Sequence, residues 1–178
     1  MLRRLEAGLH SVARGKTSGL VSSKVGGLVG ANDGALQSVE ASGAVVGGES
    51  SYIGGLVGTH GNNFASYIES SKASGTVQGG ARANVGGLVG QNQSQITNSS
   101  ATGGVSGGVA ATLGGLIGTN SGTVRQSVAS GKITTMAPVN RQTFGGLVGA
   151  NFGDMAFNGV SGEAALVPLY SINRGSIR

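Results

Sequence analysis

Apolar residues recur along this chain at fixed offsets within blocks of similar length. Each block opens with an apolar residue followed by Gly-Gly-Leu-Val-Gly or Gly-Gly-Leu-Ile-Gly, at positions 26–30, 54–58, 86–90, 114–118 and 145–149. Successive copies start 28, 32, 28 and 31 residues apart. Self-similarity at such a period is the signature of stacked units, none of which can bury its apolar face alone. The pattern therefore predicts a repeat array, in contrast to a globular enzyme domain.

Within each block the periodicity favours strands over helices. A second repeated segment, Ala-Ser/Thr-Gly-x-Val/Ile, alternates small or apolar residues with polar ones, as at 41–45 and 129–133. A period of two is typical of β-strands. Glycine accounts for 36 of the 178 residues, and each glycine inside a helix costs about 1 kcal/mol relative to alanine. We expect an all-β chain, a parallel β-solenoid (β-helix) built from about five repeats of ~30 residues each.

Stacking the repeats in parallel, about 4.8 Å apart, places like residues on one another. The predicted structural core has one row of leucines and one of block-ending glycines: Leu28, Leu56, Leu88, Leu116, Leu147, Gly30, Gly58, Gly90, Gly118 and Gly149. A second apolar row comprises Leu36, Phe64, Ile96, Val124 and Met155, with four extra residues of the second block placed after Phe64. A polar row is expected to form a turn ladder that hydrogen-bonds along the stack: Asn32, His60, Asn92, Asn120 and Asn151. We expect glycines to supply both left-handed corners and close backbone approach.

The organisation of the chain follows from these repeats. Residues 25–164 hold the five repeats, and residues 1–24 are expected to be a degenerate N-terminal repeat or cap because 10–17 is similar to 126–133. Residues 165–178 leave the pattern and are expected to be a C-terminal cap or linker. Arg3 and Arg4 are not followed by the apolar region of a secretory signal, and no apolar stretch is long enough for a transmembrane helix. Two expectations stay open: the chain starts inside a longer array, or it begins with a decayed unit that caps it.

The net charge of +5 does not predict nucleic-acid binding once its distribution is considered. Residues 1–24 carry +4 and residues 165–178 carry +2, whereas the repeats at 25–164 carry −1. The repeats also lack a basic stripe interleaved with aromatic residues, on which bases would stack. We expect no nucleic-acid partner and no membrane insertion.

Candidate catalytic and metal-binding patterns are weak. Residues 13–17, Ala-Arg-Gly-Lys-Thr, end like a phosphate-binding loop, but His10 occupies the place of its first glycine. The acidic residues do not share an offset in adjacent repeats, as paired glycosidase carboxylates would require. His10 and His60 lack cysteine or carboxylate neighbours at zinc-ligand spacing. We expect no catalytic residues, no cofactor and no metal site.

The block Gly-Gly-Leu-Val-Gly-x-Asn-x-Gly-x-Ile/Val, followed by Ser-x-Ala-x-Gly-x-Val, resembles the GLUG motif across residues 25–164. That resemblance implies a repeat region of a large bacterial surface or secreted protein, such as a filamentous-haemagglutinin-like adhesin or an immunoglobulin-A-cleaving metallopeptidase. It brings no catalytic residues, since the zinc signature His-Glu-x-x-His is absent here. It also implies an extracellular or cell-surface location.

Three functions remain open on this basis. The first is a non-enzymatic adhesive surface that contacts a host-cell glycan or protein through variable polar residues and the insertion near 62–72. The second is a spacer or filament subunit whose repeats associate end to end, because exposed strand edges favour such pairing. The third is a polysaccharide-acting β-helical enzyme, or the non-catalytic part of a secreted peptidase.

Overall fold

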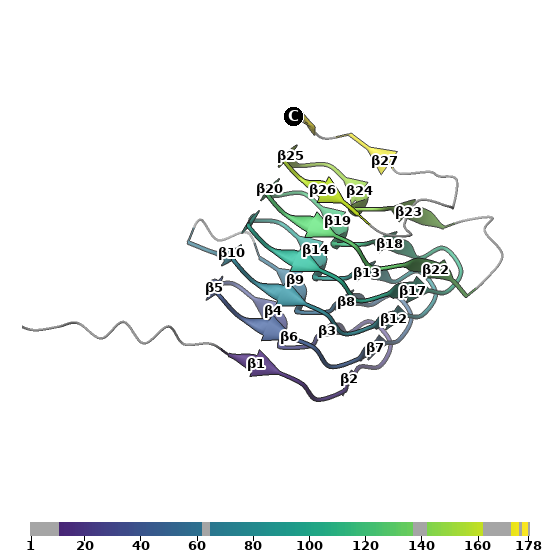
Figure 1. The fold of residues 1–178 in the computed structure, drawn as a ribbon. Coiled ribbons are helices and arrows are strands. Elements are labelled where there is room, and N and C mark those ends of the chain that lie inside the picture. The colour runs from purple at the N-terminus through teal and green to yellow at the C-terminus, as the bar shows by residue number, and fades with distance from the viewer. Residues whose placement is uncertain (1–10, 62–64, 137–141, 162–171, 175, 178) are drawn as a thin grey trace, which may run out of the picture.

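The computed structural model describes residues 11–61, 65–136, 142–161, 172–174 and 176–177. It is all-β, and its parallel strands stack into a β-solenoid of about five turns, which confirms the predicted fold class (Figure 1). Within these ranges no helix is long and apolar enough to cross a membrane.

A complete turn of the solenoid contributes one strand to each of five parallel sheets, named here A to E, and the described part of the last turn contributes to sheets A, C, D and E. Sheet A contains β1 (Val12–Ala13), β6 (Glu40–Ala41), β11 (Lys72–Ala73), β16 (Ser100–Ala101), β21 (Val128–Ala129) and β26 (Gly159–Val160). Sheet B contains β2 (Thr17–Ser18), β7 (Val45–Gly47), β12 (Val77–Gly79), β17 (Val105–Gly107) and β22 (Ile133–Thr135). Sheet C contains β3 (Lys24–Gly26), β8 (Tyr52–Gly54), β13 (Asn84–Gly86), β18 (Thr112–Gly114) and β23 (Thr143–Gly145).

The other two sheets continue to the C-terminal strands. Sheet D contains β4 (Val29–Asn32), β9 (Val57–His60), β14 (Val89–Asn92), β19 (Ile117–Asn120), β24 (Val148–Asn151) and β27 (Ile172–Asn173). Sheet E contains β5 (Ala35–Gln37), β10 (Tyr67–Glu69), β15 (Gln95–Thr97), β20 (Thr123–Arg125), β25 (Asp154–Ala156) and β28 (Ser176–Ile177). We number the coils by their sheet C strand, so that coil 1 is β3–β7, coil 2 β8–β12, coil 3 β13–β17, coil 4 β18–β22 and coil 5 begins at β23. Strands β1 and β2 pair with coil 1, and β27 and β28 pair with coil 5.

The interior is divided into two apolar columns that run along the stack. The first is built by sheets A, D and E together with the repeated leucines, and the second by sheets B and C. In coil 3, Leu88 and Ile96 belong to the first column, whereas Val85 and Val105 belong to the second. Sheets E and B accordingly lie at opposite ends of each coil (Figure 1). Each coil buries its apolar residues against the equivalent residues of the adjacent coils, so its stability depends on those neighbours.

The structure corrects the predicted second apolar row and the place of the insertion. Phe64 lies outside the described residues, and Ile68 pairs with both Leu36 and Ile96 in sheet E. The extra residues of coil 2 therefore fall between Gly61 and Ser66, before the row residue instead of after it. Parallel pairing requires the whole of β10 to match β5 and β15, and only this placement keeps all three of its residues in register.

The structure also corrects the expected role of glycine at the corners. The left-handed residues are all non-glycine: Ser22, Ser50, Arg82 and Ala110 between sheets B and C, and Ser38, Ser70, Asn98, Gln126 and Phe157 between sheets E and A. None of the glycines in coils 1 to 4 has a φ angle in the left-handed region. Glycine is required in this fold because neighbouring backbones approach closely. The predicted role of glycine in close backbone approach is therefore confirmed, and its predicted role at left-handed corners is wrong.

Candidate functional site

The Gly-Gly-Leu-Val-Gly segment forms the tight turn from sheet C to sheet D. In coil 3, a Cβ atom added to Gly90 would lie 2.6 Å from the carbonyl oxygen of Gly58 and 2.9 Å from the carbonyl carbon of Tyr52. A Cβ atom added to Gly87 would lie 2.9 Å from the Cβ of Ala101. Because Ala101 opens the second repeated segment, Ala-Thr-Gly, the two repeated segments of a coil touch each other. Their contact explains why they recur together.

The predicted leucine row lies in the first apolar column. Leu56, Leu88 and Leu116 are fully buried, Leu147 is nearly so, and Leu28 is partly buried against the same column. Their backbones also form a ladder, in which each leucine N–H donates to the leucine carbonyl of the next coil at 2.8–3.0 Å. The glycines of the predicted core are buried in coils 2 to 5, whereas Gly30 in coil 1 is half-buried.

The predicted polar row lies at the ends of the sheet D strands, and all five side chains are buried. Amide groups hydrogen-bond from coil to coil: Nδ2 of Asn92 donates to Oδ1 of Asn120 at 2.7 Å, and Nδ2 of Asn120 donates to Oδ1 of Asn151 at 2.8 Å. The same side chains close the following corner, since Nδ2 of Asn92 also donates to the Ser94 carbonyl and its Oδ1 accepts from the Ser94 N–H. Each asparagine therefore joins two coils and caps one turn.

His60 is the irregular member of this row. Its Nδ1 lies 3.1 Å from the Asn32 amide nitrogen and 3.3 Å from the Asn32 carbonyl oxygen, and a neutral ring can satisfy only one of these groups. Its Nε2 is buried without a hydrogen-bond partner in the structure. Burial lowers the pKa of His60 below its ordinary value of 6.5, against smaller raising effects of the backbone of Asn32 and Gln95 and the charge of Asp33. The ring is therefore neutral and poorly satisfied.

A second polar row, of serines, was not among the predicted site residues. The Ser71 N–H donates to Oγ of Ser99, and the Ser99 N–H donates to Oγ of Ser127, each at 3.2 Å. In coil 5, Oδ1 of Asn158 takes the place of the serine oxygen. The signal was present in the sequence as a serine two residues before the repeated alanine in coils 2, 3 and 4, at Ser71, Ser99 and Ser127, whereas coil 1 has Val39 at this place.

The outer face of sheet E is the broadest polar surface on which the residues differ from coil to coil. One outward row contains Ala35, Tyr67, Gln95, Thr123, Asp154 and Ser176, and the other contains Gln37, Glu69, Thr97, Arg125 and Ala156. Within this face, Nε2 of Gln37 donates to Oε2 of Glu69 at 3.0 Å. The exit of the coil 2 insertion is fixed beside it, since Oγ of Ser94 donates to the carbonyl of Ser66 at 2.6 Å. The interior is thus uniform while this face differs at every step.

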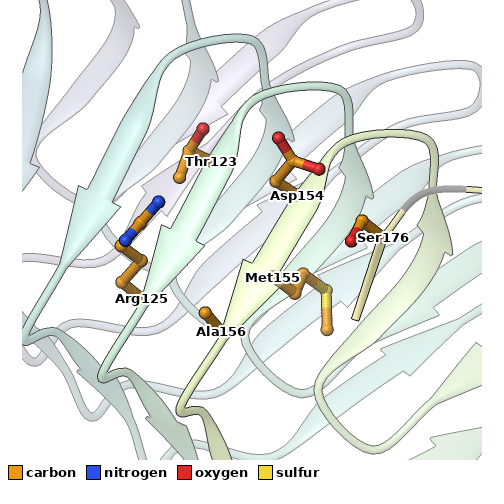
Figure 2. A pocket seen from close by; sticks show the side chains of 6 residues that line it. All are labelled: Thr123, Arg125, Asp154, Met155, Ala156 and Ser176. Atoms are coloured by element: carbon orange, nitrogen blue, oxygen red, sulfur yellow. The ribbon is translucent and has the colours of Figure 1, made fainter. Parts of the chain in front are cut away.

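A hollow interrupts this face where coils 4 and 5 meet β28. Thr123, Arg125, Asp154, Met155, Ala156 and Ser176 line it (Figure 2). The view shows the carboxylate of Asp154 above the middle of the hollow and the guanidinium of Arg125 at one side. Within the described part of the chain, no group of three or more histidine, cysteine or acidic residues is placed to hold a metal ion.

Comparison with known families gives one match. Residues 49–78 and 81–106 match the model of the GLUG motif, and they correspond to most of coil 2 and of coil 3. These two segments are GLUG-motif repeats, and sheet pairing extends the same register to the coils on either side. No curated protein and no solved structure matches the chain.

Proposed function

We propose that this GLUG-repeat solenoid is a non-enzymatic structural and adhesive region of a bacterial extracellular or cell-surface protein. The observation that carries the proposal is the contrast between a uniform interior and a variable outer face. The coils repeat the leucine and glycine positions of the interior and, apart from Val39 and His60, have a serine or asparagine at each of its two polar positions, whereas neighbouring coils share few residues on the face of sheet E. A scaffold that repeats only what stacking requires leaves its surface free to recognise a partner.

The face of sheet E supports recognition better than the other sheets do. Its strands are three residues long and each presents two side chains outward, whereas sheet A strands present one. Tyr67, Gln95 and Thr97 lie side by side on coils 2 and 3 and give this face an aromatic ring, an amide and a hydroxyl. We propose a host-cell glycan or protein as the partner, held by this face and by the insertion before Tyr67.

Adhesion of the purified, labelled chain to epithelial cells tests the proposal. We expect saturable binding that persists at physiological salt, because the repeats carry almost no net charge. Binding that depended on electrostatic attraction to phosphate groups would instead be weakened by salt screening. The variant Tyr67→Ser/Gln95→Ser should weaken adhesion. A matched control, Gln78→Ser/Thr134→Ser, changes exposed residues on sheet B at the opposite end of the coils and should leave adhesion intact. Absence of saturable binding by the unaltered chain would refute the adhesive role.

A spacer or filament subunit is the second candidate, favoured by the surface at one end of the solenoid. Leu20 is 84 % exposed and Val21 is also exposed, next to β2 and β3. Among the described strands, β4 and β5 are outermost in their sheets and leave backbone groups for a further strand. Light scattering at increasing concentration should then show growing species that Leu20→Ser suppresses. A monomer at every concentration would exclude this candidate.

A further inference from the structure

Coil 5 differs from the other coils in carrying exposed aromatic residues at both ends of its sheet E strand. Phe152 precedes β25 and is 48 % exposed, and Phe157 follows β25 and is 77 % exposed. By strand register, coil 3 has Gln93 and Asn98 at these two places. Exposure of two large apolar side chains beside one short strand is unfavourable in water, and a ligand that covers them would offset that cost.

Phe157 also occupies a left-handed corner. Its φ angle is 55°, in the left-handed region, where a bulky side chain is a genuine outlier and costs about 1–2 kcal/mol. Coils 1 and 2 place Ser38 and Ser70 at the same corner. The corner is left-handed in all five coils, and what is particular to coil 5 is the exposed aromatic ring that it places there, next to the sheet E face.

Strand β25, which Phe152 precedes and Phe157 follows, contributes Asp154 to the hollow that Thr123, Arg125 and Ser176 line with it (Figure 2). Thr123, Asp154 and Ser176 belong to one outward row on three adjacent strands, and Arg125 belongs to the neighbouring row. Arg125 and Asp154 are both exposed, and neither forms an ion pair with another described residue. The hollow thus offers a charged donor, a charged acceptor and two hydroxyl groups to a ligand.

We propose that this surface of coil 5 binds a neutral oligosaccharide, an inference that rests on the proposed adhesive function and names its ligand class. The carboxylate of Asp154 disfavours phosphate and other anions, and the guanidinium of Arg125 disfavours cations. Both groups form strong charge-assisted hydrogen bonds with hydroxyl groups. The aromatic faces of Phe152 and Phe157 carry negative charge density and suit the C–H groups of sugar rings. A chain of sugars that spans β25 satisfies the polar hollow and covers both aromatic side chains.

Binding of the whole chain to immobilised neutral oligosaccharides of glucose, mannose or galactose tests this assignment, with hyaluronan oligosaccharides as an anionic comparison. The variant Phe152→Ser/Phe157→Ser places at both corners the residue that other coils already have, as Ser121 and Ser38 show, so the fold is expected to persist. We expect its affinity for a neutral probe to fall about tenfold or more, because buried aromatic contacts dominate such interfaces. Asp154→Asn and Arg125→Gln should each weaken binding as well.

The matched control is Gln93→Ser/Asn98→Ser, which makes the equivalent changes in coil 3 and should bind like the unaltered chain. Equal loss in this control, binding of the anionic probe alone, or no binding of any neutral probe would overturn the assignment to coil 5. Thermal denaturation of each variant checks its fold. Cell adhesion measured on the same variants separates the two proposals: adhesion that persists without neutral-oligosaccharide binding leaves the adhesive function standing and removes this site.

Discussion

Replacement of Asn92 by aspartate tests whether the buried amide row holds the coils together through hydrogen-bond donation. Nδ2 of Asn92 donates to Oδ1 of Asn120 at 2.7 Å and to the Ser94 carbonyl at 3.0 Å, and the residue is fully buried. An ionised aspartate has the same shape but no donor, so an oxygen would face two other oxygens. Two lost bonds cost about 1 kcal/mol each. The buried, uncompensated charge raises the total to about 3–5 kcal/mol.

The pH dependence makes the test specific. In the folded chain the carboxyl group of Asn92→Asp would be disfavoured in its charged form, so its pKa should lie above the unfolded value of about 3.9. The unfolded state then loses its proton first, and stability falls as pH rises from about 3.9 towards the folded pKa. The deficit relative to the unaltered chain should therefore be small near pH 3 and full near pH 7, changing by about 1.4 kcal/mol per unit between the two pKa values.

Urea denaturation followed by far-ultraviolet circular dichroism measures this deficit against the unaltered chain at each pH. Asn92→Ala should cost about 2–4 kcal/mol at every pH, because it loses three hydrogen bonds without adding a charge. Asn98→Asp is the matched control, since Asn98 is exposed at a corner, and it should change stability by less than about 0.5 kcal/mol. Equal, pH-independent losses in Asn92→Asp and Asn92→Ala would show that the row acts by packing alone.

Three further changes probe other parts of the fold. Gly90→Ala should cost about 3 kcal/mol or more in urea denaturation, because its Cβ would meet the backbone of Gly58, whereas Gly34→Ala, whose Cβ would lie at an ordinary 3.9 Å from Oδ1 of Asn32, should be neutral or slightly stabilising. Because the folded pKa of His60 lies below 6.5, the stability of the unaltered chain should fall by about 1.4 kcal/mol per unit as pH drops below 6.5, until the folded ring takes up its proton. His60→Asn should remove that part of the pH profile, and a profile identical to that of the unaltered chain would contradict the assignment. Ala110→Gly should stabilise coil 3 by about 0.5–1 kcal/mol, measured as a rise in the urea midpoint, because φ at Ala110 is 59°.

The sequence was sufficient to predict the parallel stacking and the leucine row because stacking places each repeated residue on its own copy. Leu88 lies between Leu56 and Leu116, as the spacing of the repeats requires. The insertion was harder to place, since Phe64 and Ile68 are both apolar and both fit the local pattern. Pairing of β10 with strands on both sides selects Ile68, and that information lies in the neighbouring coils.

The corners and the hollow could not be predicted for different reasons. The left-handed corners accept serine, asparagine, arginine, alanine and phenylalanine, so no single residue type marks them. The hollow combines Thr123 and Asp154, which are in adjacent repeats, with Ser176, which follows the last repeat. Only the pairing of β28 with β25 brings Ser176 to that surface. A comparison of repeats with one another does not detect a site that lies where the repeats stop matching.

The one-dimensional character of the solenoid explains how such a site is tolerated. Each coil contacts only its neighbours, so a local cost such as the left-handed Phe157 is confined to coil 5 and the coil beside it. The glycines of the turn from sheet C to sheet D and the asparagine row cannot vary in the same way, because each of them contacts two coils at once. Selection for binding can therefore act on the outer face of a single coil while selection for stacking fixes the interior. On this reasoning, placing phenylalanines at the equivalent positions of coil 3, as Gln93→Phe/Asn98→Phe, should leave the fold intact without creating the coil 5 site, because coil 3 has Gln95 at the place of Asp154. The test combines this variant with Phe152→Ser/Phe157→Ser in one chain. If that chain binds neutral oligosaccharides, aromatic exposure alone suffices and the polar hollow plays no part.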